Sequence, residues 1–162
     1  MSEKEMFLQT WEHEYPITVK VLKAYPADRL DYRPHEKNRS GRELAWIFVG
    51  EQGVVDMAVK GKIDFTAPGP PPPNTMAEIL AAYENITKAN MQKVKAMSDA
   101  DYNSQITWPV GAGKTVNMRK ADVLWITVMD AVHHRGQMSV YIRLAGGKVP
   151  SIYGPSADEP FM

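Results

Sequence analysis

The sequence predicts an all-α protein built as a four-helix bundle. Three S/T-x-x-E capping boxes are each followed by an apolar run of helical periodicity, and a fourth long periodic stretch lies near the C-terminus. We therefore expect helices at about 2–24, 40–60, 75–97 and 118–145. The chain of 162 residues suffices for one good core, so we expect a single domain spanning 1–162.

Each of the first three helices begins at one of these boxes. In such a box the Ser or Thr side chain and the Glu side chain satisfy backbone N–H groups at the helix start. Pro16 falls inside the first helical pattern and is expected to kink or split that helix. The boxes are Ser2 with Glu5, Ser40 with Glu43, and Thr75 with Glu78.

The sequence also predicts the structure of two connections between the helices. Ala67–Asn74 reads A-P-G-P-P-P-P-N, which is typical of a stiff polyproline II segment. A ligand for a Pro-binding domain is one interpretation, but a connector is favoured because capped helices flank the segment directly. Gln105–Trp108 and Lys114–Val116 are expected to pair as a short hairpin around Val110–Gly113.

Composition excludes several classes of function. Lys plus Arg equals Asp plus Glu at 19 each, which gives no electrostatic reason to expect nucleic acid or acidic membranes as partners. There is no cysteine, so disulfides, thiolate nucleophiles and sulfur-ligated zinc are excluded. No apolar run approaches the roughly 20 residues of a membrane span, and the N-terminus lacks the apolar core of a signal peptide, so we expect a cytoplasmic protein.

The second helix carries a carboxylate where its apolar stripe predicts a buried side chain. The stripe consists of Leu44, Ile47, Phe48, Val54, Val55 and Ala58. Glu51 falls within it and is expected to point inward, where an ionised carboxylate needs a partner. Alternatively, Glu51 lies at the edge of the stripe or pairs with an arginine.

The fourth helix carries a similar anomaly in the stretch D-A-V-H-H-R-G-Q. Asp130 and His134 are four residues apart, so both project from one face of the helix. This spacing suits a divalent metal ion, and it equally suits a simple Asp–His hydrogen bond. His133 is rotated by roughly 100° from His134, so one ion cannot easily take both. A Ser–His–Asp triad is excluded because no serine lies in a strand–turn–helix elbow, and His13 and His35 are expected at the surface.

The segment H-H-R-G-Q-M-S-V-Y-I-R-L-A-G-G-K-V-P-S-I-Y-G-P-S-A-D-E-P, His133–Pro160, closely resembles the C-terminal signature of the DinB-like (YfiT-like) superfamily. Ser40–Gln52 and Leu30–His35 resemble its other motifs, in the same order. The resemblance implies a four-helix bundle, usually dimeric, with a divalent metal near one end held by three histidines. His134 matches one ligand position.

The resemblance also shows where this chain departs from the family pattern. Asp130 stands at the second ligand position, and Ile47, which cannot ligate, stands at the third. Glu51, one turn beyond Ile47, is the replacement, which gives a metal site of Glu51, Asp130 and His134. This oxygen-rich set favours manganese, iron or magnesium over nickel or copper. Zinc and nickel stay on the list of possible metals.

By resemblance, the protein is a metal-dependent enzyme, either a thiol S-transferase or a hydrolase, acting on a low-molecular-weight thiol or another small molecule. His133 or Arg135 is expected to steer an anionic substrate, unless Arg135 holds the C-terminal tail. The alternative is a metal-free bundle that serves as a small-ligand binder or stress-response dimer, and whether the chain is an enzyme stays open. We expect a homodimer with the exposed Trp46 in its interface.

The C-terminal segment Lys148–Pro160 is expected to fold back over the bundle as an ordered strap. Its prolines stiffen it, and Asp158 and Glu159 are available to pair with helix arginines. We assign this strap a structural role.

Overall fold

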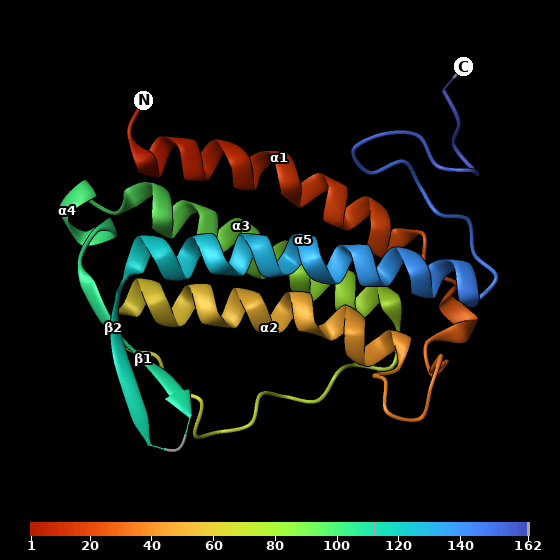
Figure 1. Cartoon of the computed structure of the whole chain (residues 1–162), viewed down its shortest axis with the longest axis horizontal. Helices are drawn as coiled ribbons and strands as arrows, with labels where there is room; N and C mark the ends of the chain where they lie inside the picture. Colours follow the sequence, from red (N-terminus) through yellow and green to blue (C-terminus); the bar gives the residue numbers. More distant parts are fainter. Residues whose placement is uncertain (112, 162) are drawn as a thin grey trace.

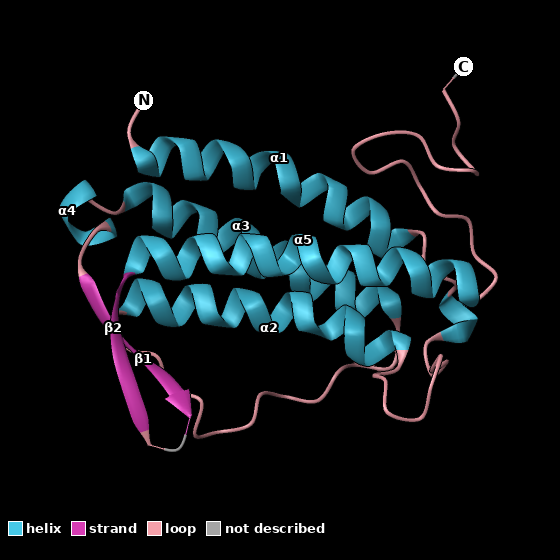
Figure 2. Cartoon of the chain, viewed as in Figure 1, coloured by secondary structure: helices cyan, strands magenta, loops and turns pink. Residues whose placement is uncertain are grey.

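Four long helices form the body of the molecule, which the computed structural model describes over residues 1–111 and 113–161. They are α1 (Glu3–Lys23), α2 (Gly41–Lys60), α3 (Met76–Ala96) and α5 (Lys120–Leu144). The neighbouring pairs are α1–α5, α5–α2, α2–α3 and α3–α1, so the helices enclose one interior (Figures 1 and 2). The predicted four-helix bundle is confirmed, with helix ends within two residues of those expected.

All three predicted capping boxes form. At the start of α1, the Ser2 hydroxyl accepts a hydrogen bond from the Glu5 N–H, and the Glu5 carboxylate accepts one from the Ser2 N–H. Ser40 with Glu43, and Thr75 with Glu78, make the same pair of bonds at α2 and α3. Pro16 does not split α1, which runs through it without a break; its missing N–H removes only one bond of the helix.

The order of helix directions explains the long Pro-rich connection. α1 and α5 run one way along the bundle and α2 and α3 run the other way (Figure 1). The chain must therefore return the full length of α2, about 30 Å for 20 residues, before α3 can begin. An extended polyproline segment of about 3 Å per residue covers that distance with few residues. The connector interpretation of Ala67–Asn74 is the one that the fold supports.

The connector is held against α2 by Trp46. The indole Nε1 of Trp46 donates a hydrogen bond of 2.8 Å to the carbonyl of Pro70. Trp46 is therefore half-buried beneath the connector rather than exposed as expected, whereas the homodimer stays a prediction.

Between α3 and α5 lie a short helix and a two-stranded sheet. α4 (Asp99–Tyr102) was not predicted, and it leads into β1 (Gln105–Gly111) and β2 (Lys114–Arg119). The antiparallel register pairs Trp108 with Val116, so the predicted hairpin is confirmed and extends further than expected. Ala112, within the expected turn, lies outside the described residues.

The interior consists of two apolar clusters separated by a polar layer. One cluster, around Phe48, lies toward the end that holds the loop 24–40, and the other, around Phe7, lies toward the hairpin end. Buried polar side chains from all four helices lie between them: Thr18, Glu51, Gln52, Thr87, Asn90, Thr127 and Arg135. Burying so many polar groups halfway along a bundle is costly unless they are paired or serve a site.

The C-terminal strap folds back beside α1 and α5 (Figure 1). Asp158 pairs with Arg143 of α5, and Glu159 pairs with Lys20 of α1 at 2.7 Å. The predicted strap is thus present, and the partners of its two acidic residues are one arginine and one lysine rather than two arginines.

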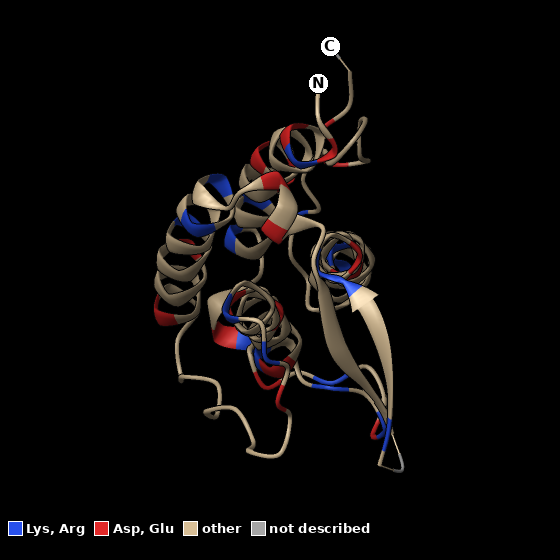
Figure 3. Cartoon of the chain, turned by 90° about the vertical axis from the view of Figure 1, so that its left-hand side faces the viewer, with Lys and Arg blue, Asp and Glu red and all other residues tan. Residues whose placement is uncertain are grey.

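The helices carry mixed charges, as the equal numbers of basic and acidic residues led us to expect. Lys and Arg are interspersed with Asp and Glu over the helices (Figure 3). No helix in the described part of the chain combines the length and apolarity that crossing a bilayer requires.

Candidate metal centre

Two facing helices bring together the three side chains predicted to bind a metal. α2 contributes Glu51, and α5, which packs beside it, contributes Asp130 and His134. His134 Nε2 lies 3.6 Å from Asp130 Oδ2 and 3.8 Å from Glu51 Oε1. One ligand atom from each residue lies within 4.8 Å of the other two. The site therefore has the composition expected from the sequence.

The group lies halfway along the helices rather than near one end of the bundle. Glu51 is near the midpoint of α2 (Gly41–Lys60), and His134 follows the midpoint of α5. This position, in the polar layer between the two apolar clusters, corrects the location that the family resemblance implied.

Glu51 points into the interior, as its place in the apolar stripe predicted. Its side chain is 6% exposed, and neither carboxylate oxygen has a hydrogen-bond partner among the described residues. Burial, with a smaller contribution from the nearby charge of Asp130, raises the pKa of Glu51 to about 9. The alternatives of an edge position or an arginine partner for Glu51 are therefore wrong.

One ring nitrogen of His134, Nε2, faces the two carboxylates, and the other, Nδ1, is held by Gln137. Oε1 of Gln137, an acceptor, lies 3.1 Å from His134 Nδ1, which suits the tautomer with its proton on Nδ1. In that tautomer Nε2 holds a lone pair, which is the form that binds a metal. Phe48 packs against the imidazole with the two rings nearly perpendicular.

The direct Asp130–His134 hydrogen bond, the competing interpretation of this spacing, is not formed. The separation of 3.6 Å exceeds hydrogen-bond length. Asp130 is 50% exposed, so it lies at the boundary between the interior and solvent. A shallow cavity of about 470 Å³ lies on this side of α5, lined by Trp125, Ile126, Met129, Asp130 and His133.

The donor set fits a divalent cation. Metal–ligand bonds of about 2.0–2.2 Å place neighbouring ligand atoms about 3.0–3.4 Å apart. The two distances from His134 Nε2, 3.6 and 3.8 Å, need to shorten by a few tenths of an ångström, and no pair of ligand atoms needs to close by more than about 1.8 Å. Two carboxylates and a neutral imidazole also carry the charge that balances a divalent ion. Such an ion would give the two oxygens of buried Glu51 the partner that no described residue supplies.

Two residues discussed from the sequence lie away from this group. Ile47 is half-buried and lines a groove beneath the Pro-rich connector, together with Trp46 and Pro70. Arg135 is buried against α1, where its guanidinium contacts the Glu14 carboxylate and the Tyr153 hydroxyl of the strap. Arg135 thus holds the tail, and its expected alternative role in steering substrate is wrong.

His133 and Gln137 occupy the exposed side of α5 next to the candidate ligands. Gln137 Nε2 lies 3.0 Å from His133 Nε2, so Gln137 connects the two histidines. His133 lines the cavity beside Asp130 and is exposed. The role of Gln137 was missed from the sequence, although its position three residues after His134 was a usable signal.

Comparison with known proteins places the chain in a family. Residues 1–160 match the DinB family. The chain belongs to the DinB family. A DinB-like protein of Bacillus cereus ATCC 10987 with a solved structure is 25% identical, with a TM-score of 0.77 over 92% of this chain and 97% of that chain.

A second solved structure and a sequence relative also resemble this chain over most of its length. YjoA, a DinB-like protein of Bacillus subtilis, is 14% identical and superposes with a TM-score of 0.68 over 91% of this chain and 97% of its own. The uncharacterized protein YrdA of Bacillus subtilis (strain 168) is 29% identical over 154 residues, which cover 94% of this chain and 89% of YrdA. These likenesses identify the fold and leave the chemistry to the residues of the site.

Proposed function

We propose that this DinB protein is a metal-dependent enzyme that binds one divalent ion per chain through Glu51, Asp130 and His134. The observation that carries the proposal is the buried Glu51 carboxylate, whose two oxygens have no hydrogen-bond partner among the described residues and lie close to an imidazole nitrogen and a second carboxylate. A structural role alone gives no reason to keep an unpaired carboxylate in the interior, because its burial destabilises the fold.

The reaction class follows from what such a site supplies. A divalent ion bound there acts as a Lewis acid, which lowers the pKa of a coordinated water or thiol near neutral pH. Thiol S-transfer to an electrophile and hydrolysis both use that chemistry, and a low-molecular-weight thiol or another small molecule is the substrate. Among metals, the two carboxylates favour manganese, iron or magnesium.

The protein's own residues orient the site and give access to it. Gln137 holds the His134 ring so that Nε2 faces the carboxylates. Asp130, half-exposed, opens the group to the cavity on α5, whereas Phe48 and Glu51 close it on the interior side. His133, at the cavity wall, is positioned to exchange a proton with a substrate there.

Calorimetric titration with Mn²⁺ and Zn²⁺ tests the metal site. We expect one ion per chain for the natural sequence, and loss of binding in Asp130→Ala and in His134→Ala. His133→Ala is the matched control, because His133 neighbours His134 and is exposed, yet it is not one of the three residues whose ligand atoms gather. This variant should keep the affinity.

Activity is tested separately on the metal-loaded protein. Thiol addition to a chromogenic electrophile and hydrolysis of an activated ester should each be compared before and after chelation. Chelator-sensitive turnover in either assay supports the proposal. Protein that binds no ion and keeps its stability with chelator present would favour the metal-free ligand-binding alternative.

A further inference from the structure

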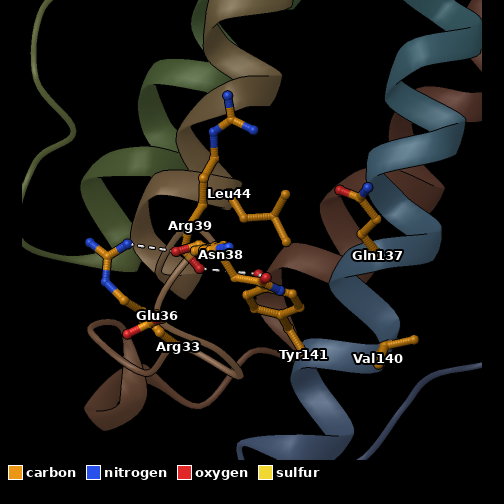
Figure 4. A pocket seen from close by; sticks show the side chains of 9 residues that line it. Arg33, Glu36, Asn38, Arg39, Leu44, Gln137, Val140 and Tyr141 are labelled. Carbon is orange, nitrogen blue, oxygen red and sulfur yellow. Dashed lines mark hydrogen bonds between the residues drawn. The ribbon is translucent and has the colours of Figure 1, made fainter.

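A second cavity lies beyond the candidate metal centre, where the loop between α1 and α2 crosses the C-terminal part of α5. It measures about 740 Å³ and opens between that loop and the side chains of α5 (Figure 4). Its lining is mostly polar and basic: Arg33, Glu36, Lys37, Asn38, Arg39, Leu44, Gln137, Val140 and Tyr141.

Positive charge in this cavity is only partly neutralised. The Arg33 guanidinium is engaged by the Glu43 carboxylate at 3.0 Å and by the Asn38 carbonyl at 2.7 Å. Lys37 and Arg39 have no ion pair with any described residue, and the one acidic side chain in the lining is Glu36. The cavity therefore favours an anion, whose oxygens accept hydrogen bonds from guanidinium and ammonium groups.

The basic wall is tied to the bundle. The Tyr141 hydroxyl donates a hydrogen bond of 3.1 Å to the Arg39 carbonyl and accepts one of 3.1 Å from Asn38 Nδ2. Figure 4 shows the loop residues gathered over Tyr141 by these bonds. A cavity held in this way is formed before a ligand arrives, so binding does not require ordering of the loop.

This cavity and the candidate metal centre lie along the same two helices. Leu44 precedes Glu51 by seven residues on α2, and Tyr141 follows His134 by seven residues on the antiparallel α5. Seven residues of helix span about 10 Å, so the cavity lies about that far from the metal ligands. Gln137 belongs to both places, since it lines the cavity and hydrogen-bonds His134.

We propose that this cavity binds a carboxylate or phosphate group of the substrate and thereby places the substrate's reacting end at Glu51, Asp130 and His134. The inference rests on the proposed function for the reacting end, whereas anion binding by Lys37 and Arg39 does not depend on a metal. The substrate class is a small molecule with an oxyanion about 10 Å from its reactive group.

The anion site is tested on metal-free protein with chelator present. Backbone amide signals are followed by NMR during titration with succinate and with inorganic phosphate, at ionic strength held constant with chloride. We expect saturable shifts of the amides of Lys37, Arg39 and Tyr141, and the tighter of the two probes identifies the oxyanion. Shifts that do not saturate, or that spread evenly over surface lysines, would overturn the anion site.

Two variants should change the affinity of the cavity for the anion in opposite directions. The double variant Lys37→Ala/Arg39→Ala should weaken binding about tenfold or more, because it removes charge-assisted hydrogen bonds. Glu36→Gln should tighten binding, since it removes the opposing charge. Lys95→Ala, an exposed lysine near the far end of α3, is the control and should leave affinity unchanged. Unaltered affinity in the double variant would refute the assignment.

The link to the metal centre is tested with ω-mercaptoalkanoic acids of increasing chain length on Mn²⁺-loaded protein. Affinity measured by calorimetry should peak at the length that spans about 10 Å, and the peak should vanish in Lys37→Ala/Arg39→Ala. Affinity that rises steadily with chain length in both proteins would contradict the link. If Mn²⁺ itself does not bind, the proposed function fails while the metal-free titration still decides the anion site.

Discussion

Replacing Glu51 by glutamine should stabilise the metal-free protein while it abolishes metal binding. Glutamine keeps the shape of the side chain and cannot ionise. The natural carboxyl group must stay protonated in the folded interior, because burial raises its pKa to about 9 from the ordinary value of 4.5. In the unfolded chain the same group ionises freely, which favours unfolding at neutral pH.

The size of the effect follows from this difference in pKa. Below pH 4.5 both states are protonated, so Glu51 costs nothing through ionisation. Between pH 4.5 and about 9 only the folded state holds the proton, so the free energy of unfolding falls by about 1.4 kcal/mol per pH unit. At pH 7 the accumulated penalty is about 3 kcal/mol, and Glu51→Gln removes it.

Urea unfolding at pH 5, 6, 7 and 8 with chelator present measures this penalty. The difference between Glu51→Gln and the natural protein should grow with pH in favour of the variant, while any constant offset from the new amide stays the same at each pH. Glu12→Gln, at an exposed position of α1, is the control and should show no such slope. A stability difference for Glu51→Gln that does not change with pH would show that Glu51 does not take up a proton on folding.

Three further outcomes are expected. Mn²⁺ at a hundredfold excess over its dissociation constant should raise the free energy of unfolding by about 2.7 kcal/mol, and Asp130→Ala should show no such gain in thermal melts. Metal affinity should rise as pH increases from 6 to 8, since the ion displaces the Glu51 proton. Calorimetry in buffers of different ionisation enthalpy should detect the released proton, and an affinity that does not change with pH would contradict this prediction. In urea unfolding, Arg135→Met should lower the free energy of unfolding by about 3–5 kcal/mol, because it leaves the Glu14 carboxylate without its buried partner. Arg143→Met, which breaks a surface ion pair, should lower it by less than about 1 kcal/mol.

The fold was predictable because its signals are local. A capping box such as Ser40 with Glu43 is read within four residues, and the structure forms its bonds as expected. α4 (Asp99–Tyr102) gave no comparable signal, since four residues are too few for a hydrophobic period. The position of Trp46 depended on a contact with Pro70, 24 residues away, which no local pattern encodes.

The candidate site was predictable only where helical spacing was enough. Asp130 and His134 share a face because they are four residues apart, and Glu51 interrupts an apolar stripe. The partner of Arg135 was beyond this reasoning, because Glu14 lies 121 residues away on another helix. The sequence likewise did not show that Gln137 fixes the His134 ring, since that depends on side-chain rotamers.

The metal site itself is best tested by diffraction from crystals grown with Mn²⁺, recorded on both sides of the manganese absorption edge. We expect one anomalous peak per chain, about 2.0–2.2 Å from His134 Nε2 and from an oxygen of each of Glu51 and Asp130. Crystals soaked to saturation that show no peak there, with Asp130 moved to hydrogen-bond His134 Nε2 directly, would contradict it.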